Sequence, residues 1–451
     1  MVSAKKRIWG WYFFDWASQP YNTLVLTFIF GPYFAEVARA HFAAQGMEAA
    51  AAGAAAQSAW GWGLTASGII IAILAPLLGA VADQSGRRMV WIWIFSVFYV
   101  VGSLGLWWLV PVQPPLMSVV ILFGIGLIGM EFTTIFTNAL LPDLAEDEQL
   151  GGISGSGFAF GYAGGVVSLA IMLALFAESG VTGKTLIGLD PILGLDATAR
   201  EGTRFVGPFS AIWYVVFMIP FFLWVREPRS TRAPVDLGRA WRDLMALLRS
   251  LPGRRSLSAY LGSSMLFRDA LNGLYAFGGV YASGVLGWSV IQIGIFGVIS
   301  AVAAAIVSWI GGRADRRYGP KPVLIATVLA LIAVCTVIVG MTPASVWGVP
   351  ISPATANAIF YACGVVIGGA GGSLQSASRT MMVRHTTPDR ATEAFGLYAL
   401  SGKATAFLAP ALIAGVTAIT SSQRLGISPL IGLFILSLVL LIWVKPQGDR
   451  A

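Results

Sequence analysis

The stretch GAVADQSGRR at residues 79–88 recurs in altered form as GGRADRRYGPK at residues 311–321. In each stretch an apolar run ends at a glycine, an aspartate follows four residues later, and basic residues come next. The two aspartates, Asp83 and Asp315, lie about half of the 451-residue chain apart. A charged turn that recurs at half-length in a hydrophobic chain predicts two similar helical bundles joined in series.

The composition excludes an ordinary water-soluble domain. Hydrophobic residues make up 57% of the chain and charged residues 11%, whereas soluble domains carry roughly 25% charged residues. Apolar segments long enough to cross a bilayer recur throughout. We therefore predict an all-α integral membrane protein with about twelve transmembrane helices in two pseudo-symmetric six-helix bundles. The expected spans lie near residues 11–36, 60–82, 90–110, 116–141, 152–177, 207–225, 257–284, 289–312, 322–342, 354–378, 393–419 and 428–444.

The basic residues indicate the orientation of these spans. Most of the 29 Lys and Arg residues fall near the N-terminus and in alternate connections, which by the positive-inside rule predicts that both termini are cytoplasmic. The stretch after Lys5, Lys6 and Arg7 imitates a signal peptide, but it is long and no small-residue cleavage site follows, so we interpret it as a retained first span. The net charge of +8 is therefore topogenic. No basic soluble domain that would bind nucleic acid is predicted.

A basic connection at residues 226–256 separates the expected bundles, which occupy residues 1–225 and 257–451. Apolar residues recur within this connection at helical spacing: Leu237, Trp241, Leu244, Leu248 and Leu251. This pattern predicts an amphipathic helix on the inner leaflet. A topogenic tether is the simpler interpretation, and a regulatory docking site is the alternative.

Five ionisable residues fall inside the expected spans, away from the span ends: Asp15, Glu131, Arg268, Asp269 and Lys403. Each costs roughly 2.5–3.5 kcal/mol at the bilayer centre, so such residues are expected to face one another or a watery cavity. Polar residues at helical spacing accompany three of them and complete the candidate set for substrate and proton binding: Gln19, Asn22, Thr134, Asn138 and Asn272. The alternative is that opposite charges pair and hold the helices together without meeting substrate.

The two charged turns have a separate physical rationale. An aspartate at the end of a span can accept hydrogen bonds from the N-terminus of a neighbouring helix, where the helix dipole favours negative charge. A clasp of this kind would close the cytoplasmic side in one state and open in another. The alternative is a pair of tight turns with topogenic arginines. The candidate gating residues are Gly79, Asp83, Gly86, Arg87, Arg88, Gly311, Asp315 and Arg316.

These turns resemble the signature of the major facilitator superfamily, the first turn more closely than the second. Other stretches resemble its vacuole-effluxer-like branch, which includes fungal vacuolar amino-acid exporters: WYFFDWASQPYNTLVLTFIFGPYF at 11–34, NALLPDLA at 138–145, ISGSGFAFGYAGG at 153–165 and SLQSASRTMMVRHTTPDRATEAFGLYALSGK at 373–403. The resemblance implies a twelve-helix fold that works by alternating access, with spans 1, 4, 7 and 10 lining a central cavity.

The resemblance also adds candidate residues and sets a limit. It implies that Gln375 and Arg379 on the tenth span line the cavity, although Arg379 is alternatively placed at the cytoplasmic mouth. The seventh span departs from the usual aspartate-glycine pair of this branch, because it reads Asp269-Ala270. The identity of the substrate is therefore the least transferable property.

Together these features predict a secondary transporter in the cytoplasmic membrane of a bacterium, acting on a small polar organic solute. An amino acid is the leading expectation, because opposite charges in one cavity suit a zwitterion. The resemblance implies export, and Glu131 and Asp15 suggest coupling to protons. The alternatives are an exporter of amphipathic drugs or lipids, which would need fewer charges, and a membrane sensor that binds a solute without moving it. We find no nucleophile–base set or metal cluster in the sequence, so we predict no enzyme activity and no cofactor; the chain is expected to act as a monomer.

Overall fold

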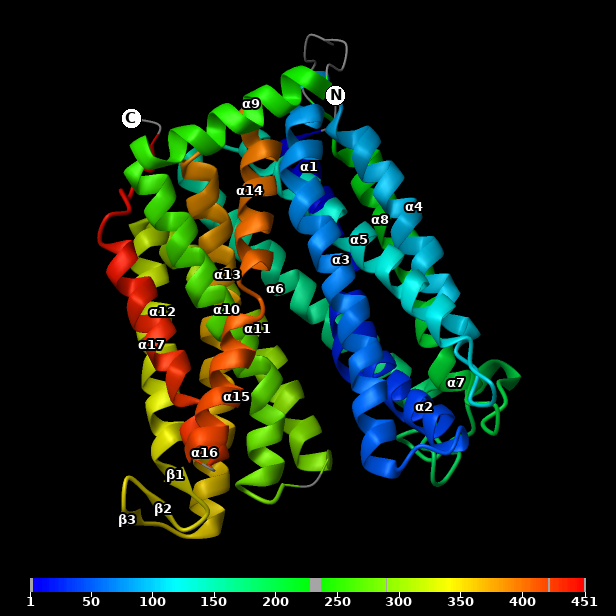
Figure 1. The fold of residues 1–451 in the computed structure, drawn as a ribbon. Helices are drawn as coiled ribbons and strands as arrows, with labels where there is room; N and C mark the ends of the chain where they lie inside the picture. Colours follow the sequence, from blue (N-terminus) through cyan, green and yellow to red (C-terminus); the bar gives the residue numbers. More distant parts are fainter. Residues whose placement is uncertain (1–2, 228–236, 289, 421, 450–451) are drawn as a thin grey trace. The chain divides into compact units, whose positions relative to one another are not determined.

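The computed structural model describes residues 3–227, 237–288, 290–420 and 422–449, which are almost entirely helical (Figure 1). Within these residues, eleven helical segments are long and apolar enough to cross a membrane. They coincide with eleven of the twelve expected spans. The remaining expected span, the seventh, coincides with α10 (Arg255–Gly284), a helix of 30 residues that carries Arg268 and Asp269. The prediction of an all-helical membrane protein is confirmed.

The chain divides into two compact units, and we describe each by itself. Unit 1 consists of Met1–Leu74, Arg87–Thr137 and Phe160–Thr231. Unit 2 consists of Ala75–Gly86, Asn138–Ala159 and Arg232–Ala451, so it includes two segments from the first half of the sequence. The predicted division at residues 226–256 stays a prediction, and residues 228–236 of that connection lie outside the described residues.

Unit 1 contains the following helices, of which η1 and η4 are π-helical and η2 and η5 are 3₁₀: α1 (Ala4–Pro20), η1 (Tyr21–Phe28), α2 (Phe30–Ala44), most of α3 (Ala49–Ser85), α4 (Arg88–Gly105), η2 (Leu106–Trp108), α5 (Leu116–Asn138), the second half of α6 (Asp147–Ile171), η4 (Met172–Phe176), η5 (Ile192–Gly194), α7 (Glu201–Arg204) and α8 (Val206–Trp224). Both α1 and α4 pack against α8. The shared contacts make α8 the centre of this group.

The first span changes its winding at Pro20, which ends α1 and is followed by η1. A proline inside a helix has no N–H to donate and clashes with the preceding turn, so a local π-helical turn is a common response. Elsewhere in unit 1, α4 and α5 cross closely. A Cβ on Gly102 would lie 2.6 Å from the carbonyl oxygen of Leu122, so no larger residue fits at this crossing.

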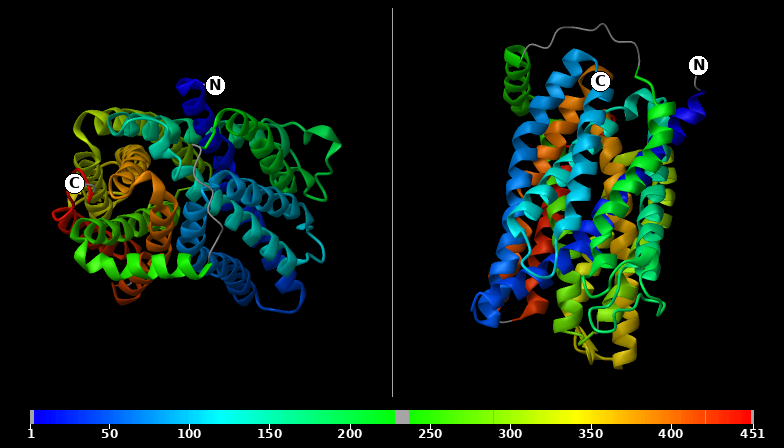
Figure 2. Two further views of the ribbon diagram at one scale, coloured as in Figure 1. Left: turned by 90° about the horizontal axis from the view of Figure 1, so that it is seen from above. Right: turned by 90° about the vertical axis from the view of Figure 1, so that its right-hand side faces the viewer.

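Unit 2 contains the ends of α3 and α6 that unit 1 lacks, together with these elements: η3 (Leu141–Asp143), α9 (Leu237–Ser250), η6 (Leu251–Gly253), α10, α11 (Val290–Tyr318), α12 (Pro320–Gly340), β1 (Met341–Thr342), β2 (Ser345–Val346), β3 (Val349–Pro350), α13 (Pro353–Arg384), η7 (Pro388–Arg390), α14 (Ala391–Ala404), α15 (Leu408–Thr420), α16 (Gln423–Gly426) and α17 (Ser428–Leu441). The strands form a small antiparallel sheet in the order β1-β2-β3, with Met341 opposite Val346 and Val346 opposite Val349. Figures 1 and 2 show α9 lying across one end of the long helices of this unit.

The long helices of unit 2 pack in pairs. α13 packs against both α11 and α12, and α10 runs along α17, as Figure 1 also shows. Small residues permit these close approaches: a Cβ on Gly369 of α13 would lie 2.8 Å from the Val307 side chain of α11.

The eleventh expected span is interrupted near its middle. α14 ends at Ala404 and α15 begins at Leu408. Between them the N–H of Ala406 donates to the Lys403 carbonyl (3.3 Å) and the N–H of Leu408 to the Thr405 carbonyl (2.8 Å). These are three-residue turns, so the regular hydrogen bonds of an α-helix stop here. Helix ends inside a membrane must be satisfied by neighbouring groups, because lipid offers none.

Candidate functional site

The polar residues of the first span lie within unit 1 against α6. Asp15, Gln19 and Asn22 are all half-buried. Glycines of α6 make room for the first two: a Cβ on Gly161 would lie 3.2 Å from the Asp15 Cβ, and one on Gly165 would lie 2.8 Å from the Gln19 Cγ. The α1 stripe therefore approaches the backbone of α6 directly.

The polar residues of α5 meet this stripe around one methionine. Asn22 Nδ2 lies 4.0 Å from Met130 Sδ, and the Thr134 hydroxyl lies 3.8 Å from the same sulfur. Glu131, the next residue after Met130, is half-buried. Unit 1 thus brings Asn22 and Thr134 together around Met130; a shared site with Glu131 stays a prediction.

In unit 2 the two candidate cations lie where α10 meets the end of α14. Arg268 donates from Nη1 to the Tyr398 carbonyl (2.8 Å), and its guanidinium lies 4.3 Å from the centroid of the Tyr398 ring. It also packs on Gly402, where any Cβ would collide with it. Lys403 occupies the last turn of α14, where the helix dipole favours a cation. Both cations are half-buried.

Asp269 caps the second part of the interrupted span. Its Oδ2 accepts the N–H of Ala409 (2.8 Å) at the start of α15, and the residue is buried. This hydrogen bond satisfies one of the N–H groups that the interruption leaves without an intrahelical acceptor. The structure therefore gives Asp269 a structural task that the sequence did not indicate. Two other candidates belong to unit 2. Asn272 is exposed, and Gln375 donates to the Gly371 carbonyl (3.4 Å).

A test of this cap compares two substitutions. Asp269→Ala removes the acceptor and is expected to lower the free energy of unfolding by about 1 kcal/mol. Asp269→Asn keeps an acceptor oxygen and should cost much less. Apparent melting temperatures in detergent measure both effects. Equal losses in the two variants would show that the hydrogen bond to Ala409 is not what Asp269 contributes.

The first charged turn forms the predicted clasp. Asp83 Oδ1 accepts the N–H of Thr392 (3.2 Å), and Oδ2 accepts the N–H of Glu393 (2.8 Å), both in the first turn of α14. Gly79, one turn earlier, faces the same segment: a Cβ there would lie 2.6 Å from the Thr392 carbonyl oxygen. Gly86 adopts a φ of 57° in the turn that follows, which favours glycine. All these residues belong to unit 2, and we call this region the basic end of unit 2; it also carries Arg316, Arg317, Arg384, Arg390 and Lys445.

A buried arginine joins further segments at the basic end. Arg379 donates from Nε to the Ser154 hydroxyl (2.9 Å), from Nη2 to the Ser154 carbonyl (2.8 Å) and from Nη1 to Asn138 Oδ1 (3.1 Å). Its guanidinium also lies 4.3 Å from the centroid of the Phe158 ring. Asn138 was predicted on the polar stripe of the fourth span, and the family resemblance implied Arg379 as a lining residue of the tenth. The structure brings them together at the end of α5 instead, which fits the alternative placement of Arg379 at the mouth.

The second charged turn differs from the first. Asp315 is buried against the first turns of α6, where a Cβ on Gly151 would lie 2.5 Å from its Cγ. Gly312 and Gly155 touch across the same contact. The polar neighbours of Asp315 are Thr380 and Arg384, and within the described part of the chain no backbone N–H donates to its carboxylate. The two turns are alike in sequence, but only Asp83 binds the N-terminus of a helix.

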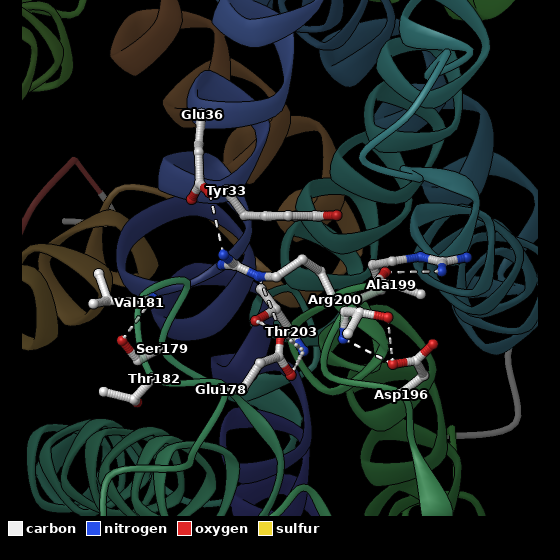
Figure 3. Close-up of polar contacts among 12 residues, drawn as sticks. Tyr33, Glu36, Glu178, Ser179, Val181, Thr182, Asp196, Ala199, Arg200 and Thr203 are labelled. Carbon is white, nitrogen blue, oxygen red and sulfur yellow. Dashed lines mark hydrogen bonds and ion pairs between the residues drawn. The ribbon is translucent and has the colours of Figure 1, made fainter.

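Unit 1 contains a further polar cluster that was not predicted from the sequence (Figure 3). Glu178 accepts the backbone N–H of Thr203 (3.1 Å) and its hydroxyl (2.7 Å), and it pairs with Arg200 Nε (3.0 Å). Arg200 in turn reaches Glu36 on α2 (3.1 Å). In the same connection, hydrogen bonds from the side chain and backbone of Thr198 lower the pKa of Asp196. The long segment between η4 and α8 is thereby fastened to the first span.

This cluster gives a sharp prediction, because its two carboxylates differ in exposure. The Glu178 side chain is 0% exposed and that of Glu36 is 53% exposed. Glu178→Ala leaves Arg200 partly uncompensated and should lower the free energy of unfolding by about 3 kcal/mol. Glu36→Ala is the matched control and should cost about 0.2–1 kcal/mol. Melting temperatures that fall equally would mean that burial of the Glu178–Arg200 pair does not stabilise unit 1.

The whole chain matches a known family. The family model described as "Vacuole effluxer Atg22 like" covers residues 3–450. The chain belongs to this Atg22-like family. The family assignment made from the quoted motifs is confirmed.

Curated relatives of this Atg22-like protein are distant. The MFS-type transporter YxiO of Bacillus subtilis (strain 168), described as uncharacterized, is 24% identical over 445 residues, which is 97% of this chain and 94% of YxiO. Autophagy-related protein 22 of Cryptococcus neoformans var. neoformans serotype D (strain B-3501A) is 23% identical over 281 residues, which is 60% of this chain and 50% of that protein.

Solved structures show the fold of the Atg22-like chain. The human organic anion transporter MFSD10 (TETRAN) matches with a TM-score of 0.70 at 16% identity, over 98% of this chain and all of that one. The proton:xylose symporter XylE matches with a TM-score of 0.67 at 12% identity, over 99% and 97% of the two chains. The Atg22-like protein is therefore a multi-pass secondary transporter with the major facilitator fold, and not an enzyme.

The sequence did not predict several of the residue pairs that the structure shows. Glu393 lies inside the stretch 373–403 that carried the resemblance, yet nothing in its spacing marks it as the partner of Asp83. Glu178 and Arg200 lie in a long connection without periodicity, so no pattern pairs them. Pairs that are distant in sequence and outside a helical stripe leave no signal in one sequence.

Proposed function

We propose that this transporter exports a small zwitterionic solute, with amino acids as the leading candidates, across the cytoplasmic membrane of a bacterium by alternating access. In this proposal the basic end of unit 2 and both termini face the cytoplasm. Support for the orientation comes from the arginines and lysines gathered at that end. Support for export comes from the description of the family as effluxers.

The observation that carries the substrate class is the separation of charge between the units. Among the candidate residues inside the expected spans, the ionisable ones of unit 1 are the carboxylates Asp15 and Glu131. Those of unit 2 are the cations Arg268 and Lys403, together with Asp269, whose carboxylate caps α15. A zwitterion carries one ammonium and one carboxylate group, so each set of candidate residues offers a partner of opposite charge to one end of it.

Coupling to protons is the second part of the proposal. Glu131 is a half-buried carboxylate inside a span, and such groups commonly relay protons in transporters. One proton moving down roughly 150 mV supplies about 3.5 kcal/mol, which is enough for a solute gradient of a few hundredfold. Glu131→Gln should therefore abolish proton-driven accumulation. If accumulation persists in a folded Glu131→Gln variant, this residue is not the coupling group.

Counterflow in proteoliposomes tests the substrate class. Vesicles loaded with an unlabelled amino-acid mixture receive trace labelled amino acids, using the original chain and the Glu131→Gln and Lys403→Ala variants. We expect labelled uptake by the original chain and a loss of at least tenfold in Lys403→Ala. Uptake of amphipathic drugs or lipids instead of amino acids would overturn the proposal that the substrate is a zwitterion. Binding without uptake of any solute would indicate a sensor.

A further inference from the structure

A cavity of about 310 Å³ lies at the basic end of unit 2, and none of its lining residues is among the candidates discussed for transport. Its walls come from the first turns of α10, the end of α13, the start of α14 and the C-terminal tail. Protein interiors leave few voids larger than one water molecule, and this space equals the volume of roughly ten waters. It also reaches the lower end of the size range of ligand pockets, about 300 Å³.

The cavity contains two ion pairs. Arg254 Nε lies 3.8 Å from Asp449 Oδ2, and Arg390 Nε lies 3.2 Å from Glu393 Oε2. The charges therefore balance. Both arginines keep partly exposed side chains, 53% for Arg390 and 33% for Arg254, while the carboxylates are largely covered. Each guanidinium has five N–H groups, more than the single contact between Arg390 Nε and Glu393 requires.

We infer that this cavity is a binding site for a small zwitterion with an apolar part, and that its occupancy favours the clasped arrangement of α14. The guanidinium forks of Arg254 and Arg390 suit the anionic group of the ligand, since they can bind carboxylate or phosphate in a bidentate manner. Glu393 and Asp449 suit its cationic group. Leu257 and Leu397 line the same cavity and suit its apolar part. A ligand with only one charge would disturb the charge balance of the two ion pairs, whereas a zwitterion preserves it.

The link to the clasp is a single residue. Glu393 donates its backbone N–H to Asp83 (2.8 Å), and its carboxylate belongs to the cavity. A ligand that fixes the first turn of α14 holds the N–H groups of this turn in the position that Asp83 requires. By linkage, the ligand favours the clasped state only to the extent that it binds this state more tightly, and the clasp must tighten ligand binding by the same factor.

Two sources offer this chemistry. One is a free amino acid or similar solute in the cytoplasm, and the other is the zwitterionic headgroup of a phospholipid such as phosphatidylethanolamine. The inference does not depend on the substrate proposed above, because the cavity residues differ from Glu131, Arg268 and Lys403. Variants of the two sets can therefore be compared in one experiment.

The test uses the full chain in nanodiscs of phosphatidylglycerol, with L-leucine as the soluble probe and isovalerate and isopentylamine as its singly charged analogues. Binding is measured by calorimetry. The clasp is followed by the distance between spin labels on Gln84→Cys and Asp389→Cys, which can be labelled selectively because Cys335 and Cys363 are buried. We expect leucine, but neither analogue, to bind and to shift the label distance towards a single short value.

The variants assign the site. Arg390→Gln and Ala394→Met, which fills the cavity without changing charge, should weaken leucine binding at least tenfold. Arg317→Gln removes an exposed arginine of the same end that does not line the cavity, and it should have no effect. Melting temperatures verify that each variant folds.

Three outcomes decide the inference. If nanodiscs of phosphatidylethanolamine shorten the label distance without leucine and block its binding, the site is confirmed with the lipid headgroup as its ligand. If leucine binding is lost in Lys403→Ala but not in Arg390→Gln or Ala394→Met, leucine binds at the intramembrane charges; the transport proposal then gains support and the cavity inference is wrong. If neither leucine nor phosphatidylethanolamine has an effect, the cavity does not bind zwitterions.

Discussion

Arg379→Lys is expected to slow transport at least tenfold while leaving the protein folded. The Arg379 guanidinium donates two hydrogen bonds to Ser154 and one to Asn138, and the arginine is buried. A lysine ammonium is a compact point charge and cannot span these three acceptors with the geometry of a planar guanidinium. A hydrogen bond to a charged group contributes about 1.5–3 kcal/mol, and about 1.4 kcal/mol corresponds to a factor of ten. The loss of one of these three hydrogen bonds is therefore enough for a tenfold effect.

The initial rate of counterflow measures this effect, and the melting temperature verifies folding. Arg317→Lys is the matched control, because Arg317 is exposed at the same end and its guanidinium lies 5.2 Å from the Tyr318 ring. That variant should transport at the original rate. Arg379→Lys protein that melts normally and transports as fast as the control would show that these three hydrogen bonds do not limit the cycle.

The spans could be predicted from the sequence because their length and apolar composition are set by the bilayer. The clasp at Asp83 could be predicted for a similar reason. An aspartate just beyond an apolar run has few favourable partners other than the N-terminus of a helix. The same reasoning applied to Asp315 gave the location of a close contact with α6, but it could not show that, among the described residues, no helix N-terminus donates to this carboxylate.

Helical periodicity predicted which residues share a face of a helix better than it predicted their binding partners. It placed Asn138 on the same face of α5 as Glu131 and Thr134, seven residues from Glu131. However, Asn138 is the last residue of α5, where a different set of neighbours is available, and it binds Arg379. A shared face is a property of one helix, whereas a binding partner depends on which helices end nearby.

The sequence carries one local signal for the interruption of the eleventh span. Pro410 cannot donate a hydrogen bond to the carbonyl of Ala406, so a continuous helix through this region is disfavoured. In the structure Pro410 falls in the first turn of α15, where its missing N–H costs nothing. The remaining part of the explanation is tertiary: Asp269 accepts the N–H of Ala409 from α10, and no pattern links residues so far apart.

Asp83→Asn is expected to shift the equilibrium of the basic end away from the clasped arrangement by about five- to thirtyfold. Each oxygen of the Asp83 carboxylate accepts a different N–H, from Thr392 and from Glu393. Asparagine offers one oxygen and one NH₂ group, so it can accept from only one of them and directs a donor at the other. It also lacks the negative charge that the dipole of α14 favours. A loss of about 1–2 kcal/mol, the usual value of a helix cap, gives the stated shift in population.

The distance between spin labels on Gln84→Cys and Asp389→Cys reports this shift, because these residues lie on the two sides of the clasp. Asp315→Asn is the matched control: it makes the same chemical change in the second charged turn, where no hydrogen bond from a helix N-terminus of the described residues is lost. Because Asp83 alone binds a helix N-terminus, the broad or long distance should appear in Asp83→Asn and not in Asp315→Asn. Equal shifts in both variants would mean that the two turns act as equivalent gates, and that their different hydrogen bonding does not determine which one holds the basic end closed.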